Sequence, residues 1–113
     1  EIEAVLDELQ AKGYISEARV AASVVHRRAP KLGTARVRQE LQSKGLPPEL
    51  VAQTVAELRQ SEQARAQDVW RRKFDAPPQN PQETVKQMRF LISRGFAPDV
   101  VRRVVAAAGQ TDD

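Results

Sequence analysis

LQSKGLPPELVAQTVA at residues 41–56 returns as LISRGFAPDVVRRVVA at residues 91–106, the same pattern of residue types 50 positions later. An earlier pair of segments, residues 16–28 and 61–73, matches with an offset of 45. A repeat of this length is typical of one supersecondary unit stacked on its own copy. Such stacks form elongated binding surfaces more often than closed catalytic pockets.

Helical periodicity runs through the chain, and single glycines and prolines mark the breaks. Seven helices are predicted, at about residues 2–12, 16–29, 34–44, 48 through at least 58, 62–74, 81–94 and 98–108. Thr34 is expected to cap the third helix, and Pro48 suits the first turn of the fourth. Asn80 and Glu83 have the spacing of a capping box at the start of the sixth.

We therefore predict an all-α fold of tandem three-helix repeats, packed near right angles in an elongated, curved array. Residues 1–13 are expected to be the last helix of a truncated first repeat. Residues 14–60 form the second repeat and 61–108 the third, followed by a frayed tail at 109–113. Because apolar helical spacing begins at Ile2, we interpret the chain as a fragment of a longer protein.

Aromatic residues are few, so their placement matters. Trp70 and Phe74, at i and i+4, are interpreted as core residues in preference to a stacking platform for bases. The inward stripe of the sixth helix is predicted to comprise Val85, Met88, Leu91 and Ile92. Phe90 points away from that stripe, so it either packs on another helix, which we favour, or is an exposed contact residue.

The inventory of reactive groups argues against catalysis. The absence of cysteine removes disulfides, thiolate metal sites and a cysteine nucleophile. His26 is the only histidine, and beside Arg27 and Arg28 it is expected to lie on the surface. No apolar run approaches the ~18 residues of a membrane span, and the glycines occur singly, not in a phosphate-binding loop. We predict a non-enzymatic, cytoplasmic protein without a cofactor or metal.

Basic residues are the better lead to function. The net charge of +3 combines two basic and five acidic residues in 1–26 with sixteen basic and ten acidic residues in 27–113. Matching positions in stacked repeats would form a basic stripe suited to DNA phosphates or to an acidic protein surface. The alternative is that these are ordinary solvated charges. The candidate contact residues are Arg27, Arg28, Lys31, Arg36, Arg38, Arg71, Arg72, Lys73, Lys86, Arg89 and Arg94.

Short motifs add a family resemblance. Arg72-Lys73-Phe74, Arg89-Phe90-Leu91 and Arg94-Gly95-Phe96 resemble the carboxy-terminal signature of the RecX family, regulators of the RecA recombinase. Gly13-Tyr14-Ile15, Glu17-Ala18-Arg19, Glu40-Leu41 and Lys44-Gly45-Leu46 resemble its central repeat. The resemblance extends from about residue 3 to 108. In two respects the chain departs from the family: Val20 stands where many members have phenylalanine, and the first two helices of the amino-terminal repeat have no counterpart.

The resemblance implies three tandem three-helix repeats without enzymatic activity. It also implies binding to RecA and to the groove of the RecA–DNA filament, which modulates, and mainly inhibits, strand exchange, ATPase and coprotease activity in recombination and the SOS response. A monomer is expected. Two alternatives remain open from the residues, an autonomous sequence-independent DNA-binding module and a helical scaffold for an unrelated protein. Charge reversal at Arg36 and Arg38 is expected to weaken filament binding without unfolding the chain.

Overall fold

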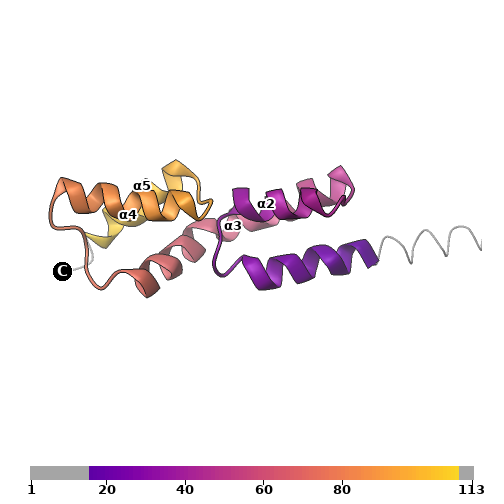
Figure 1. Cartoon of the computed structure of the whole chain (residues 1–113), viewed down its shortest axis with the longest axis horizontal. Coiled ribbons are helices and arrows are strands. Elements are labelled where there is room, and N and C mark those ends of the chain that lie inside the picture. The colour runs from indigo at the N-terminus through magenta and orange to yellow at the C-terminus, as the bar shows by residue number, and fades with distance from the viewer. Residues whose placement is uncertain (1–15, 110–113) are drawn as a thin grey trace, which may run out of the picture.

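The computed structural model of the protein describes residues 16–109, and within that range it is built of helices and loops without a strand. A helix at residues 16–28 is followed by α2 (Thr34–Ser43), α3 (Pro48–Lys73), α4 (Pro81–Ser93) and α5 (Pro98–Ala108). Figure 1 shows an elongated array, with α2 and the helix at 16–28 at one end and α4 and α5 at the other. The predicted all-α tandem array is confirmed. The helix predicted at 2–12 lies outside the described residues.

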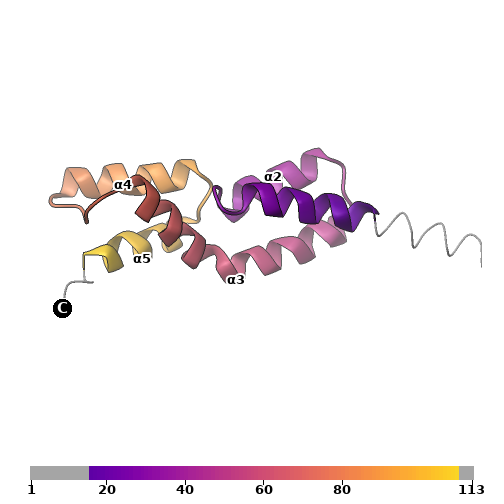
Figure 2. The same cartoon turned by 90° about the horizontal axis from the view of Figure 1, so that it is seen from below.

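Helix α3 spans both ends of the array (Figure 2). The sequence predicted two separate helices here, and this prediction is wrong: Pro48–Lys73 is one helix of 26 residues. The segment between the two predicted helices contains no glycine or proline that would end a helix. The hydroxyl of Ser61 donates to the carbonyl oxygen of Leu58 at 3.2 Å, inside the helix, instead of capping a new one. The boundary predicted near residue 60 therefore lies within a helix.

Two hydrophobic cores lie along the array, and α3 contributes to both. The first unit consists of the helix at 16–28, α2 and the N-terminal half of α3, and its core is Ala21, Val24, Ala29, Val37, Leu41, Leu50, Val51, Val55 and Leu58. The second unit consists of the C-terminal half of α3, α4 and α5, and its core is Ala66, Val69, Leu91, Phe96, Val100, Val101, Val104 and Val105. One continuous helix therefore belongs to both units.

Local signals place the helix ends as expected in most cases. Proline occupies the first turn of α3, α4 and α5, where its missing N–H would have no partner. Gly45 and Gly95, equivalent in the repeat, have φ of +70° and +94° just after α2 and α4. Thr34 does not cap α2: the N-cap is Gly33, and Thr34 is buried with its hydroxyl accepting a hydrogen bond from Arg65.

Asn80 caps α4 by accepting the N–H of Glu83 at 2.8 Å, and the Glu83 carboxylate accepts the N–H of Gln79 at 2.9 Å. Replacing Asn80 by alanine is expected to lower the free energy of unfolding by about 1 kcal/mol, because a helix N–H loses its partner. Urea denaturation followed by circular dichroism measures the change. Gln82→Ala, an exposed change in the same first turn, is the control and should have little effect.

The inward face of α4 differs from the predicted stripe. Leu91 is fully buried and Met88 is half-buried, but Val85 and Ile92 are 45% and 47% exposed. The polar Gln87 takes the inward position instead, because its amide accepts from Trp70 Nε1 at 2.8 Å and donates to the carbonyl oxygen of Ala76 at 3.2 Å. Those bonds rotate the buried face of α4 away from Val85 and Ile92.

Trp70, Phe90 and His26 lie as expected, whereas Phe74, expected in the core, is half-buried and belongs to neither core. Trp70 and Phe90 pack against the second core, and Phe74 lies between them with ring centroids 6.3 Å and 5.5 Å away. His26 is exposed on the helix at 16–28. Among the described helices, none combines the length and apolarity needed to cross a bilayer.

Candidate interaction surface at the junction of the two units

The two units meet where residues 29–36 approach the turn at 93–97, and we call this contact the junction. The N–H of Gly33 donates to the carbonyl oxygen of Arg94 at 2.7 Å, and that of Ala35 donates to Gly95 at 3.3 Å. The backbones are so close that a Cβ on Gly33 would lie 2.2 Å from backbone atoms of Gly95. The loop before α2 and the turn after α4 are thus held together by direct backbone contact.

Arg65, on the middle of α3, ties this junction together. Its Nη1 donates to the carbonyl oxygens of Ala29 and Leu32 at 2.9 and 2.6 Å. Its Nη2 donates to Thr34 Oγ1 and Leu58 O at 3.1 and 3.0 Å, and Nε donates to a hydroxyl one turn earlier at 3.0 Å. A guanidinium has five N–H groups, so every donor of this side chain has an acceptor.

Glu62 lies one turn before Arg65 and faces the second unit. It is 2% exposed, its Oε2 accepts the N–H of Ala97 at 2.8 Å, and Oε1 is buried without a hydrogen-bond partner. Burial lowers the pKa of Arg65 below its ordinary value, and the nearby Glu62 carboxylate opposes that shift. The buried carboxylate therefore offsets part of the cost of placing the guanidinium in a partly desolvated position.

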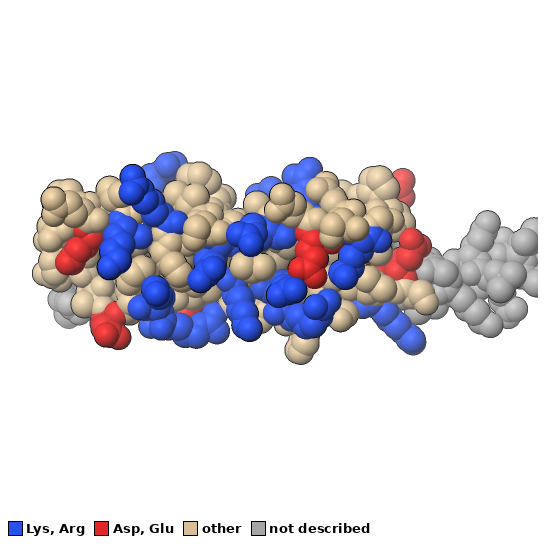
Figure 3. Space-filling view, viewed as in Figure 1, with Lys and Arg blue, Asp and Glu red and all other residues tan. Residues whose placement is uncertain are grey.

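A hollow of about 500 Å³ opens beside the junction. Its lining residues are Arg28, Lys31, Leu32, Val69, Arg72, Lys73, Phe90 and Arg94. Five of these eight residues are cations, and no acid is among them. In Figure 3 the Lys and Arg side chains gather over the middle of the face that carries the junction.

Few acids compensate this charge. Arg28 pairs with Glu40 at 2.9 Å, and Arg72 donates to the carbonyl oxygen of Pro30. Within residues 16–109 the ammonium groups of Lys31 and Lys73 make no hydrogen bond or ion pair with the protein. The hollow therefore keeps a strong positive potential for an anionic partner.

Phe90 forms part of the hollow's floor and is surrounded by cations. The Arg94 guanidinium lies 4.8 Å from its ring centroid and the Lys73 ammonium 5.3 Å from it. Phe74 meets the same ring edge-on at an interplanar angle of 88°. Cation–π attraction holds both cationic groups over the aromatic floor, so their positions at the hollow are restrained.

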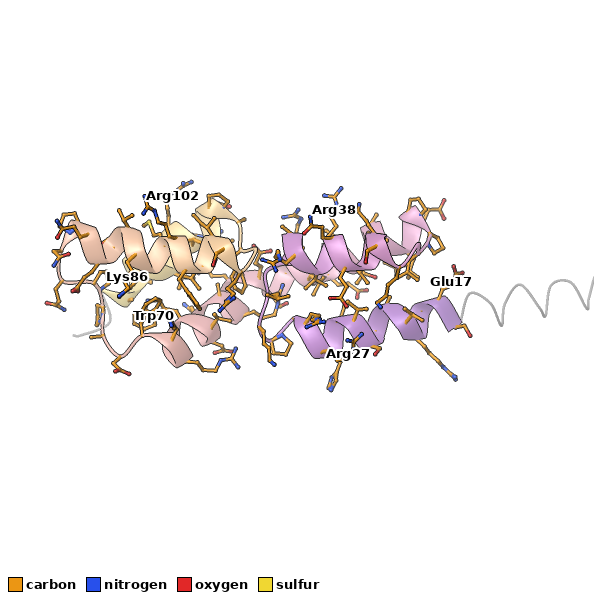
Figure 4. The ribbon with its side chains drawn as sticks, in the orientation of Figure 1. Glu17, Arg27, Arg38, Trp70, Lys86 and Arg102 are labelled. Carbon is orange, nitrogen blue, oxygen red and sulfur yellow. The ribbon has the colours of Figure 1, made fainter. Side chains whose placement is uncertain are left out.

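The predicted contact residues divide by location. Arg28, Lys31, Arg72, Lys73 and Arg94 line the hollow. Arg27 lies 3.9 Å from Glu40, Arg71 is 3.5 Å from Asp68, and Lys86 and Arg89 are exposed. Arg38 lines a separate hollow between α2 and α3, and Figure 4 shows it at the top edge of the array, opposite Arg27.

Arg36 contacts the turn at 93–97 and so forms part of the junction. Its Nη1 donates to the carbonyl oxygen of Ser93 at 2.8 Å, and its stem lies against the α-carbon of Gly95. Charge reversal there would disturb contacts between the two units as well as any partner. Arg36 is therefore a poor choice for testing binding without affecting the fold.

Sequence reasoning missed Glu62 and Arg65. Glu62 matches Glu17 in the repeat, so its recurrence was a usable signal for a structural role. Arg65 matches Val20, so the repeat gives no hint of it. Its acceptors come from residues 29, 32 and 34, more than thirty positions away, and local pattern does not reveal such contacts.

Residues 16–109 contain no cluster of three or more His, Cys, Asp or Glu side chains able to hold a metal ion. The chemistry that this arrangement supports is recognition of negative charge beside an apolar surface.

Comparison with known proteins identifies the family. Models for the second and the third three-helix domain of RecX match residues 16–55 and 60–105. Regulatory protein RecX of Leptothrix cholodnii is 54% identical over 113 residues, covering 100% of this chain and 72% of the relative. Regulatory protein RecX of Ralstonia nicotianae is 45% identical over 108 residues, 96% of this chain and 68% of the relative. No solved structure matches. The three-helix units and this similarity show that the chain belongs to the RecX family of regulatory proteins.

Proposed function

We propose that this chain regulates the RecA recombinase by binding RecA and the groove of the RecA–DNA filament, and that it lowers strand exchange, ATPase and coprotease activity. The observation that carries the proposal is the group of five cations around one hollow at the junction. A basic surface with few acidic partners attracts acidic protein surfaces and the phosphates of DNA, and the DNA of a RecA–DNA filament supplies such phosphates. The relatives named Regulatory protein RecX support a regulatory role.

The direct test is RecA ATPase on single-stranded DNA, with the chain titrated in at moderate salt. Binding to free DNA is measured in parallel under the same conditions. We expect ATPase to fall at concentrations too low to coat the DNA. Tight DNA binding with steep salt dependence and no effect on ATPase would instead favour an autonomous DNA-binding module.

Charge reversal at the hollow gives a sharper prediction. The double variant Lys31→Glu and Lys73→Glu should raise the concentration for half-maximal ATPase inhibition by about tenfold or more. The reason is that two cations that attract an anionic partner are replaced by carboxylates that repel it. Neither ammonium makes a hydrogen bond or ion pair within the described residues, and only the exposed cation–π contact of Lys73 with Phe90 is lost, so the thermal midpoint should fall only slightly.

The matched control is Arg19→Glu with Arg102→Glu. Both arginines are exposed and outside the hollow, and the change in net charge is the same. Equal weakening by the two double variants would mean that overall charge governs inhibition, and it would contradict a specific role for the hollow.

A further inference from the structure

The cations of the hollow surround one depression at the junction instead of forming a row along the array. We propose that this hollow binds a short acidic peptide segment of the partner protein and buries one apolar side chain of that segment. The inference rests on the proposed function in one respect: the surface faces a protein partner. The acid-and-apolar chemistry of the ligand follows from the hollow itself.

Charge at the rim selects an anion. Lys31, Lys73 and Arg94 have no acidic partner among the described residues, and Arg28 shares Glu40 with Arg27. Arginine binds carboxylates through two parallel hydrogen bonds, and lysine attracts them as a compact point charge. A peptide with several carboxylates would therefore satisfy the rim from more than one side.

The floor selects an apolar group. Leu32, Val69 and Phe90 form it, with Leu32 packed against the first core and Phe90 against the second. Both units therefore contribute apolar residues to this floor. The volume of about 500 Å³ lies within the range of ligand pockets, about 300 to 1,000 Å³, so it accommodates a leucine or phenylalanine side chain.

The same features are less suited to a nucleic acid strand. A phosphate backbone is best matched by a groove of cations that follows it, and the bases by aromatic faces on which they stack. Here the Phe90 ring already has Arg94 and Lys73 over it and the edge of Phe74 against it. An apolar peptide side chain does not need a free aromatic face, because Leu32 and Val69 also line the hollow.

The experiment uses the full chain and a fluorescent peptide of alternating aspartate and glutamate with one central leucine. Binding is followed by fluorescence anisotropy at moderate salt. Replacing the peptide's leucine with alanine is expected to weaken binding by about fivefold or more, because apolar burial is lost. The variant Lys31→Ala with Lys73→Ala should weaken it by about tenfold, and Arg19→Ala with Arg102→Ala by less than about twofold.

Each alternative outcome overturns the proposal. Equal affinity for the leucine and alanine peptides would exclude the apolar anchor, and equal loss in both double variants would exclude the hollow as the site. Stronger binding of an oligothymidylate strand than of the peptide, lost in the Lys31 and Lys73 variant, would assign the hollow to nucleic acid.

The RecA assay separates this inference from the proposed function. If the chain inhibits RecA ATPase but does not bind the peptide, the peptide inference fails alone. If the peptide binds at the hollow but RecA is unaffected, the proposed function fails and the assigned ligand chemistry stands.

Discussion

Replacing Arg65 by methionine is expected to lower the free energy of unfolding by about 3 to 5 kcal/mol. Methionine keeps much of the volume but leaves the carbonyl oxygens of Ala29 and Leu32 without their donor. The buried carboxylate of Glu62 also loses the positive charge beside it. Stability of a small domain is of the same order as this loss, so the variant should be largely destabilised at ambient temperature.

Urea denaturation followed by circular dichroism measures the effect of Arg65→Met. Arg65→Lys should also destabilise, by about 2 kcal/mol, because one ammonium group cannot reach acceptors spread around a planar guanidinium. The matched control is Arg59→Met, an exposed arginine on the same helix, which should stay within about 0.5 kcal/mol. A midpoint for Arg65→Met equal to that of the control would contradict the role assigned to the guanidinium.

Gly33→Ala is expected to destabilise the protein by about 2 to 3 kcal/mol through steric overlap. A new Cβ would lie 2.2 Å from the carbonyl carbon and oxygen of Gly95 and from the amide nitrogen of Phe96. These are backbone atoms, so relief requires moving the two units apart. The φ of Gly33 is −74°, which alanine adopts freely. The loss of stability therefore comes from steric overlap and not from backbone strain.

Two glycine controls separate the causes. Gly109→Ala meets only a carbonyl oxygen at 3.7 Å, an ordinary contact, and should be close to neutral. Gly45→Ala has open space but φ of +70°, so it should cost about 1 kcal/mol from conformation alone. Thermal unfolding ranks the three variants. A thermal midpoint for Gly33→Ala that is no lower than that of Gly45→Ala would contradict the close backbone approach at the junction.

Helix ends were predictable because their causes are local. The signals at the ends of α4 act through atoms only a few residues apart. They are Pro81 in its first turn, the Asn80 cap, and Gly95, whose left-handed backbone follows its last turn. The predicted break near Ser61 failed because similarity to Ser16 is not itself a stop signal. A segment without glycine or proline continues as a helix when packing on both sides allows it.

The buried faces were predictable only in part. Leu91 lies inward as periodicity indicates, but Ile92 is exposed and Gln87 is buried. A glutamine at a buried position becomes favourable when its amide finds partners, and here these are Trp70 and the carbonyl of Ala76, on other segments. Hydrophobic pattern carries no information on such long-range hydrogen bonds.

By itself the sequence determined an all-α tandem repeat, most of its helix ends, its basic character and its resemblance to the RecX family, because these depend on local residue pattern and composition. Only the tertiary structure decided which cations come together. Lys31, Lys73 and Arg94 come from three separate segments, and they meet because α3 is continuous and the backbone of Gly33 contacts that of Gly95. Such convergence is a property of packing between the units, which no local pattern encodes.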